Sequence, residues 1–229
     1  MTSPLVIFDL DGTLIDTAPD LIDSLNDTIS TVGLAPVTFD DLTHLVGQGA
    51  RMMIKRAFDL RKVTLDDVQA EALFAHFIKH YHAHMPGKSR PFDGVVACLE
   101  RLSAAGMTLA VCTNKAEELA VPLLEKLGLS GHFAATTGGD TFAVRKPDAG
   151  HILGTIERAG GDPKQSLMVG DSINDILAAK NAGIPSIAVD FGYSDVPVAS
   201  LSPSRVISHF NEFTVDMAKE LLASSKVSS

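Results

Sequence analysis

The chain has 229 residues, of which 45% are hydrophobic and 21% are charged, and its formal net charge is −9 at pH 7. This composition is typical of a globular protein and provides enough apolar material for one large domain or two smaller ones. The negative charge argues against nucleic acid or an anionic membrane as a general partner, since both require excess Lys and Arg.

The N-terminal part of the chain predicts one strand followed by a run of helices. An apolar run predicts a strand over Leu5–Phe8. The next 70 or so residues show helical spacing and no convincing strand, which predicts an all-helical insertion. Four helices are predicted there, over residues 19–32 between Pro19 and Gly33, over Phe39–Val46, over Ala50–Leu60, and over residues 64–85 with Thr64 as the N-cap.

From residue 92 onwards, strand-like and helix-like segments alternate. The predicted strands are Met107–Cys112, Phe133–Thr137, Leu167–Val169 and Ser186–Val189. The predicted helices are Val95–Ala105, Ala116–Leu127, Ala149–Ala159 and Ile173–Ala182, and each is followed by a glycine that can end it in a left-handed conformation. This alternation predicts an α/β fold with a Rossmann-like, doubly wound parallel sheet, which the first strand would join.

The most distinctive polar segment follows the first predicted strand. Residues 8–13 read Phe-Asp-Leu-Asp-Gly-Thr, which places Asp9 and Asp11 where the strand ends. Carboxylates there can hold a hard cation, and one of them can act as a covalent nucleophile. A calcium loop would require flanking helices and a Glu at its twelfth position, which is Asp20 here. The residues therefore favour a catalytic site over a calcium loop or a purely structural turn.

Three further polar groups follow predicted strands or precede predicted helices. Thr113-Asn114 follows the second strand, Lys146-Pro147 precedes a helix, and Gly170-Asp171-Ser172 with Asp175 follows the strand over residues 167–169. Ligands of an open parallel sheet bind beyond the carboxyl ends of its strands. We therefore expect these groups to meet Asp9 and Asp11 at one edge of the sheet.

These four segments resemble the four motifs of the haloacid dehalogenase superfamily of phosphohydrolases. The helical insertion between the first two motifs is similar to the helical cap of one branch of that superfamily. The resemblance implies a catalytic core over residues 1–16 and 88–229 and an α-helical cap domain over residues 17–87. Within the superfamily the chain is most similar to bacterial phosphoglycolate phosphatases, through segments such as Asp16-Thr17-Ala18-Pro19-Asp20 and Thr113-Asn114-Lys115.

The resemblance also implies catalytic roles. Asp9 is expected to attack phosphorus and form an aspartyl-phosphate that water hydrolyses. Asp11 is expected to protonate the departing alkoxide and then to act as general base. Thr113, Asn114 and Lys146 are expected to bind the phosphoryl oxygens.

The cofactor that the resemblance implies is Mg²⁺. Its expected ligands are the Asp9 carboxylate, the Asp11 backbone carbonyl and the Asp171 carboxylate. Asp175 is expected at the same metal site, as a direct ligand or through water. The metal would offset the repulsion between these carboxylates and a phosphate dianion.

Substrate choice is expected to come from the helical cap. Residues 47–49 read Gly-Gln-Gly and lead into a predicted helix, whose N–H groups suit a carboxylate. Arg51 would add a fork-shaped donor. We therefore expect Gly47, Gly49 and Arg51 to bind the carboxylate of 2-phosphoglycolate, with the alternative that Arg51 only packs on the cap surface.

Other functions are compatible with the same residues. They are a phosphatase for another small phosphate ester or for pyrophosphate, a phosphomutase, and a binding protein without activity. Asp11 favours phosphoryl transfer over dehalogenation, since a dehalogenase has no alkoxide to protonate. Product analysis separates a phosphatase from a mutase, because the first releases phosphate and the second an isomerised sugar.

The remaining expectations concern location and assembly. Residues 1–4 lack the basic region of a signal peptide, and no uncharged stretch reaches the roughly 18 residues of a membrane span. Cys98 and Cys112 are expected to be free thiols in buried positions. We expect a cytoplasmic monomer or homodimer that acts on a small phosphate ester, with no nucleic acid and no membrane as partner.

Overall fold

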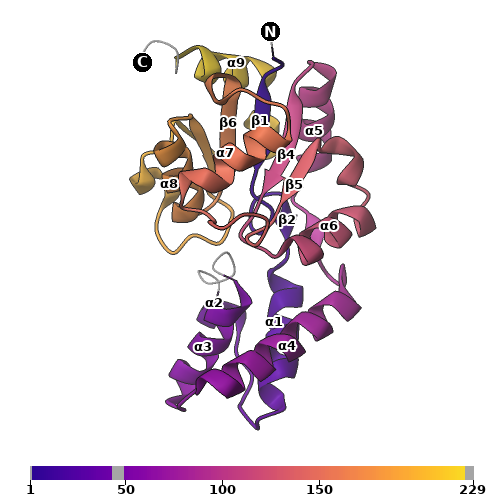
Figure 1. Cartoon of the computed structure of the whole chain (residues 1–229), viewed down its shortest axis with the longest axis vertical. Coiled ribbons are helices and arrows are strands. Elements are labelled where there is room, and N and C mark those ends of the chain that lie inside the picture. Colours follow the sequence, from indigo (N-terminus) through magenta and orange to yellow (C-terminus); the bar gives the residue numbers. More distant parts are fainter. Residues whose placement is uncertain (1, 43–48, 225–229) are drawn as a thin grey trace.

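A six-stranded parallel sheet forms the centre of the protein, whose computed structural model describes residues 2–42 and 49–224 (Figure 1). The strand order is β5-β4-β1-β6-β7-β8. The strands are β1 (Leu5–Phe8), β4 (Thr108–Cys112), β5 (Ala135–Thr137), β6 (Ser166–Gly170), β7 (Ser186–Val189) and β8 (Arg205–Ile207). Because β4 lies on one side of β1 and β6 on the other, the sheet is doubly wound, as the sequence predicts.

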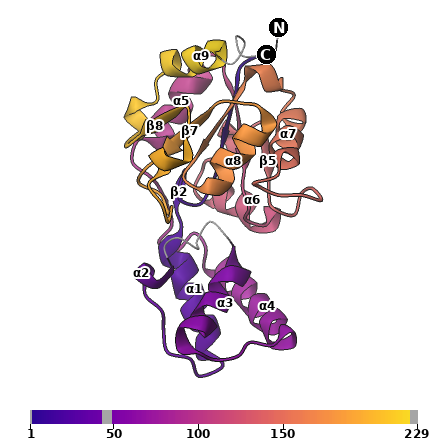
Figure 2. The same ribbon diagram turned by 90° about the vertical axis from the view of Figure 1, so that its left-hand side faces the viewer.

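Helices cover both faces of this sheet (Figure 2). They are α5 (Val95–Ala104), α6 (Glu117–Lys126), α7 (Ala149–Arg158), α8 (Ile173–Ala182) and α9 (Val215–Ser224), with short 3₁₀ helices at Ser130–His132, Pro163–Gln165, Val198–Leu201 and Phe210–Glu212. Alternate residues of β1 pack into different apolar clusters. Val6 and Phe8 pack with residues of α5 and α9, whereas Leu5 and Ile7 pack with residues of α7 and α8.

Four helices lie together beyond one end of the sheet, and we call them the helical unit (Figure 1). They are α1 (Ala18–Ser30), α2 (Phe39–Leu42), α3 (Ala50–Arg61) and α4 (Asp67–His84). Two chain segments connect them to the sheet, where β2 (Ile15–Asp16) pairs antiparallel with β3 (Arg90–Pro91). Asp20 crosses between these segments, since its carboxylate accepts hydrogen bonds from the Lys88 and Ser89 backbone N–H groups.

Most predicted elements are found close to their expected bounds. β1, β7 and α8 have the predicted residues, and the glycines after α5 to α8 have positive φ angles. The prediction of Thr64 as the N-cap of α4 is wrong, because the Asp66 carboxylate accepts from Gln69 N. The predicted helix Phe39–Val46 is described only to Leu42, since residues 43–48 lie outside the described residues.

The sequence analysis does not predict β8, α9 or the β2–β3 pair. β8 has only three residues, and only Ile207 among them is buried, so its apolar signal is weak. Among the described residues, no helix is long and apolar enough to cross a membrane. Cys98 and Cys112 are buried free thiols, and burial raises the pKa of each to about 11.

Candidate active site

The chain turns sharply after β1 and places two carboxylates at the end of that strand. Asp9 continues the sheet, since its N–H donates to Val169 O at 2.9 Å. Gly12 has a φ of +84°, and a Cβ atom there would lie 2.5 Å from Asp171 Oδ2. Glycine is therefore required for the turn and for the close approach of the β6 loop. As a result Asp9, Asp11 and Asp171 share one buried region.

The Asp171 carboxylate is fixed by hydrogen bonds to both of its oxygens. Thr13 Oγ1 donates to Oδ1 at 2.9 Å, and Tyr193 N donates to Oδ2 at 2.7 Å. Gly192 allows this arrangement, because a Cβ atom there would lie 2.2 Å from Asp171 Cβ. Asp171 is therefore held in one orientation, which a metal ligand requires.

Lys146 lies between two of the acidic side chains. Its Nζ atom is 2.8 Å from Asp9 Oδ1 and 2.6 Å from Asp175 Oδ1, and it also donates to Cys112 O at 2.6 Å. The lysine is fully buried, as is Asp175. The ammonium thus compensates two carboxylates in a region from which water is excluded.

Asp175 accepts hydrogen bonds both from the start of α8 and from Lys146. Its Oδ2 accepts from Ser172 N at 3.0 Å and from Ser172 Oγ at 2.7 Å, which forms a capping box. Its Oδ1 accepts from Lys146. Asp175 is therefore suited to fixing Lys146 in place.

Burial and mutual repulsion raise the pKa values of Asp9 and Asp171. Burial raises the pKa of Asp9 to about 7, and the charge of Asp175 adds to the effect, while Lys146 partly opposes it. Burial and the charges of Asp175 and Asp9 hold the pKa of Asp171 well above its usual range. A bound cation would relieve this excess of negative charge.

Asp9, Asp171 and Asp175 fit a hard metal ion by their donor set and spacing. One carboxylate oxygen from each lies within 4.8 Å of the others, and this is the only such group of three among the described residues. Asp9 Oδ1 is buried, and its polar partner among the described residues is Lys146 Nζ at 2.8 Å. A cluster of carboxylate oxygens with few donors is what a divalent cation would bind. The side chain of Asp11 is not in this group.

The Asp11 carboxylate has polar partners from two directions. Thr17 Oγ1 donates to its Oδ1 at 2.6 Å. Lys115 Nζ lies 3.1 Å from Oδ1 and 3.4 Å from Oδ2. Asp11 thus stands beside Asp9 but outside the group around Lys146, which suits a separate role in proton transfer.

Thr113 and Asn114 follow β4 and adjoin the acidic group. Thr113 Oγ1 accepts from Lys115 N at 3.1 Å, and Asn114 Nδ2 donates to Lys146 O at 3.0 Å. Asn114 Oδ1 is buried without a hydrogen-bond partner among the described residues. Both residues line the same cavity as Asp9 and Lys146, where they can contact an anionic ligand.

A cavity of about 520 Å³ lies between the sheet edge and the helical unit. Its lining includes Asp9, Asp11, Lys146 and Asp175 from the sheet side and Gly49 and Arg51 from α3. Gly47 lies outside the described residues. Of the sheet-edge residues predicted from the sequence, all but Asp171 line this cavity, which is large enough for a small ligand.

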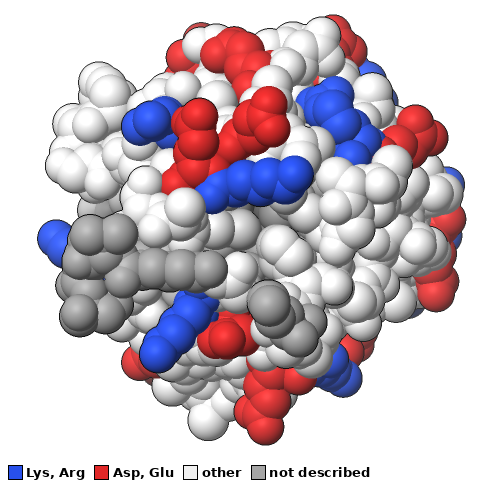
Figure 3. Space-filling view, turned by 90° about the horizontal axis from the view of Figure 1, so that it is seen from above, with Lys and Arg blue, Asp and Glu red and all other residues white. Residues whose placement is uncertain are grey.

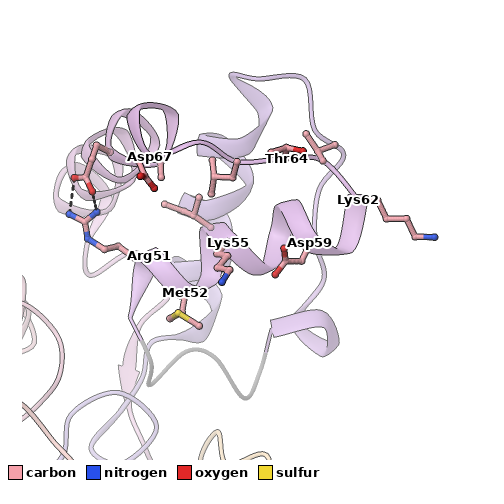
Figure 4. Close-up of a pocket in the computed structure, with 12 residues that line it drawn as sticks. Arg51, Met52, Lys55, Asp59, Lys62, Thr64 and Asp67 are labelled. Carbon is pink, nitrogen blue, oxygen red and sulfur yellow. Dashed lines mark hydrogen bonds and ion pairs between the residues drawn. The ribbon is translucent and has the colours of Figure 1, made fainter.

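Arg51 makes its closest polar contacts away from the acidic group. Its guanidinium donates to both carboxylate oxygens of Glu71 (Figure 4), and its Cζ lies 3.8 Å from the centre of the Phe74 ring. Figure 4 also shows a second cavity, of about 750 Å³, between α3 and α4. That cavity is lined by residues of the helical unit and contains none of the predicted catalytic residues.

The sequence analysis assigned no role to three residues that shape this site. Thr13 and Tyr193 orient Asp171, and Tyr193 Oη also donates to Asp16 Oδ1 at 2.7 Å. Lys115 forms an ion pair with Asp11. Lys115 directly follows Thr113-Asn114 in the sequence. Its position just after a strand is the feature from which a role in the site could have been predicted.

Comparison with known proteins agrees with this geometry. The sequence model of the family described as haloacid dehalogenase-like hydrolase matches residues 6–189. A phosphoglycolate phosphatase of Agrobacterium fabrum is 65% identical over 221 residues, which cover 96% of this chain and 95% of the relative. A phosphoglycolate phosphatase of Mesorhizobium japonicum is 50% identical over 222 residues, which cover 97% and 98%.

A solved structure shows the same fold. The crystal structure of a predicted phosphoglycolate phosphatase from Haemophilus somnus has a TM-score of 0.87 and 31% sequence identity, and the match covers 96% of this chain and 98% of that one. The Rossmann-like fold and the acidic site are those of a phosphoric monoester hydrolase. The chain belongs to the haloacid dehalogenase-like hydrolase family.

Proposed function

We propose that this protein hydrolyses 2-phosphoglycolate to glycolate and phosphate and that it requires Mg²⁺. The observation that carries the proposal is the position of Lys146, whose Nζ lies 2.8 Å from Asp9 Oδ1 at the edge of a 520 Å³ cavity. Phosphoryl transfer needs a nucleophile next to a fixed cation. The two phosphoglycolate phosphatases at 65% and 50% identity support this substrate.

Asp9 is the nucleophile in this proposal. Its carboxylate attacks phosphorus, the bond to the ester oxygen breaks, and water then hydrolyses the resulting aspartyl-phosphate. Lys146, together with Thr113 and Asn114, binds the phosphoryl oxygens. Asp175 acts on the reaction through Lys146, which it holds at 2.6 Å.

Asp11 transfers the proton. It gives a proton to the departing alkoxide and then removes one from the attacking water. The metal site comprises Asp9, the backbone carbonyl of Asp11, and Asp171, with Asp175 beside them. When bound, Mg²⁺ supplies positive charge that draws the phosphate dianion toward these carboxylates.

The helical unit acts as a cap over this site in the proposal, with the core over residues 1–16 and 88–229 and the cap over residues 17–87. Gly47, Gly49 and Arg51 are the cap residues expected near the substrate. Gly49 and Arg51 line the cavity. Arg51, Lys115, Arg145 and Lys146 supply positive charge along this cavity. The end of the molecule seen in Figure 3 shows acidic and basic side chains interspersed.

The test is phosphate release with Mg²⁺ from 2-phosphoglycolate, pyrophosphate and several sugar phosphates, with Asp9→Asn as the control. A preference for 2-phosphoglycolate that is lost in Asp9→Asn and with a chelator supports the proposal. Asp9-dependent release from other esters alone would keep the mechanism and reject the substrate. Conversion of a sugar phosphate to its isomer without phosphate release would identify a mutase instead.

A further inference from the structure

Lys115 is a buried cation to which the proposed reaction assigns no role. Its side chain is 4% exposed, and it reaches from the loop after β4 into the cavity beside Asp11. Burial of an ammonium group costs free energy, and an apolar side chain of similar size usually packs as well or better. Lys115 pairs with Asp11, and its position at the wall of the cavity also puts its charge within reach of an anionic ligand.

A residue of the helical unit also contacts Lys115. Lys115 Nζ lies 4.4 Å from the centre of the Tyr81 ring on α4, and Tyr81 stacks on Phe77. The Tyr81 hydroxyl is buried and has no hydrogen-bond partner among the described residues. Tyr81 is fully buried and is not part of the cavity lining, so its ring acts on a ligand only by holding Lys115 in place.

Lys115 remains protonated despite its burial. Burial lowers the pKa of Lys115, but the charge of Asp11 and the nearby Tyr81 side chain outweigh it, so that the pKa lies above its usual value. Arg51, Arg145 and Lys146 also line the cavity, but Arg51 donates to Glu71 and Lys146 pairs with Asp9 and Asp175. Among the described residues, Lys115 is the cation that forms an ion pair with Asp11.

The chemistry of the proposed substrate brings a carboxylate to this point. In 2-phosphoglycolate a single methylene group separates the ester oxygen from the carboxylate. When phosphorus lies at Asp9 and the ester oxygen at Asp11, the carboxylate lies one methylene group beyond Asp11. Lys115 Nζ, at 3.1 Å from Asp11 Oδ1, is within reach of it.

On the basis of the function proposed above, we propose that Lys115 binds the carboxylate of the leaving group and thereby selects carboxylated phosphate esters. Tyr81 holds the ammonium in place from the helical unit. The ammonium carries three N–H donors, so it can contact Asp11 and the carboxylate of the substrate at the same time.

The test compares two esters with the same phosphate and a similar leaving group, 2-phosphoglycolate and ethyl phosphate. In Lys115→Met, kcat/KM for 2-phosphoglycolate is expected to fall about 100-fold, because a charge-assisted hydrogen bond to the substrate is lost. For ethyl phosphate, kcat/KM is expected to fall far less, because that ester loses only the effect of the contact between Lys115 and Asp11. Lys115→Arg is expected to retain most of the preference, since it keeps the charge.

One control variant and two contradicting outcomes make the result decisive. Lys164→Met makes the same change at an exposed lysine in the 3₁₀ helix Pro163–Gln165 and is expected to alter neither rate. Equal losses for both esters in Lys115→Met would overturn the inference, since Lys115 would then only position Asp11. A loss of preference in Arg51→Ala but not in Lys115→Met would also overturn it.

The two proposals fail in different ways. Wild-type protein with no preference for 2-phosphoglycolate over ethyl phosphate rejects the proposed function. Wild-type protein with that preference, retained in Lys115→Met, rejects the role of Lys115 alone. If Lys115→Met does not fold, Lys115→Gln gives the same comparison, because it removes the charge and keeps a hydrogen-bond donor beside Asp11.

Discussion

The Asp175 carboxylate and the Lys146 ammonium form a buried ion pair with 2.6 Å between Oδ1 and Nζ. The second oxygen of Asp175 is fixed by the backbone and hydroxyl of Ser172 at the start of α8. The start of a helix thus sets the position of the cation that faces Asp9. Asp175 is therefore a positioning residue for Lys146. Kinetic measurements on a variant can distinguish this role from metal ligation.

Asp175→Asn is expected to lower kcat about 100-fold with little change in KM for Mg²⁺, because Lys146 loses one of its two carboxylate partners but the metal keeps its own. Steady-state rates at varied Mg²⁺ measure both quantities. Asp66→Asn is the matched control, since Asp66 also caps a helix, α4, with an exposed side chain. A large rise in the KM for Mg²⁺ in Asp175→Asn would show instead that Asp175 binds the metal.

Asp171→Asn tests the charge balance of the site. The pKa values of Asp9 and Asp171 are raised by burial and mutual repulsion, so the metal-free protein carries unfavourable negative charge. We expect the substitution to raise Tm in chelator by a few degrees and to abolish most of the rise in Tm that Mg²⁺ gives wild type. Thermal unfolding at pH 8, with and without Mg²⁺, measures both. An unchanged response to Mg²⁺ would place the metal elsewhere.

The strand-end residues could be predicted because each follows an apolar strand directly in the sequence. The parallel order of β4, β1 and β6 then brings Thr113, Asp9 and Asp171 to one edge without further information. Lys115 could not be assigned a role in this way, since its partner Asp11 is 104 residues away. Its contact with Tyr81 depends on how α4 lies against the sheet, which helical periodicity does not predict.

The residues that orient Asp171 could not be predicted from the sequence either. Tyr193 N and Gly192 approach Asp171 from the loop after β7, and no spacing rule relates them. Gly192→Ala is expected to weaken Mg²⁺ binding at least about 10-fold, because its Cβ atom would lie 2.2 Å from Asp171 Cβ and displace that side chain. Calorimetric titration with Mg²⁺ measures this affinity.

Gly131→Ala is the matched control for that experiment. A Cβ atom at Gly131 would meet no atom within 4 Å, and Gly131 lies in the 3₁₀ helix Ser130–His132, away from the site. We expect it to change neither Mg²⁺ affinity nor, by more than about 0.5 kcal/mol, the free energy of unfolding. Equal Mg²⁺ affinities of the two variants would contradict the tight approach of Gly192 to Asp171.

His151 on α7 gives the protein a defined dependence of stability on pH. Its ring is buried, and its Nδ1 accepts from Lys146 N at 3.2 Å. Burial, with the Lys146 charge in addition, lowers the pKa of His151 to about 4, below the value of about 6.5 in an unfolded chain. Between these values the unfolded chain binds a proton that the folded protein does not bind. The folded state therefore loses stability as pH falls from 6.5 toward 4, and keeps this contribution above 6.5.

The variant His151→Gln removes the titrating ring and keeps an acceptor for Lys146 N. We expect the free energy of unfolding of wild type to fall by about 2 kcal/mol more than that of the variant between pH 7 and pH 4.5. Urea unfolding at a series of pH values measures the difference. His82→Gln, at an exposed position on α4, should show the wild-type dependence. Because all other titrating groups are shared, parallel curves for wild type and His151→Gln would mean that the ring is already protonated in the folded protein.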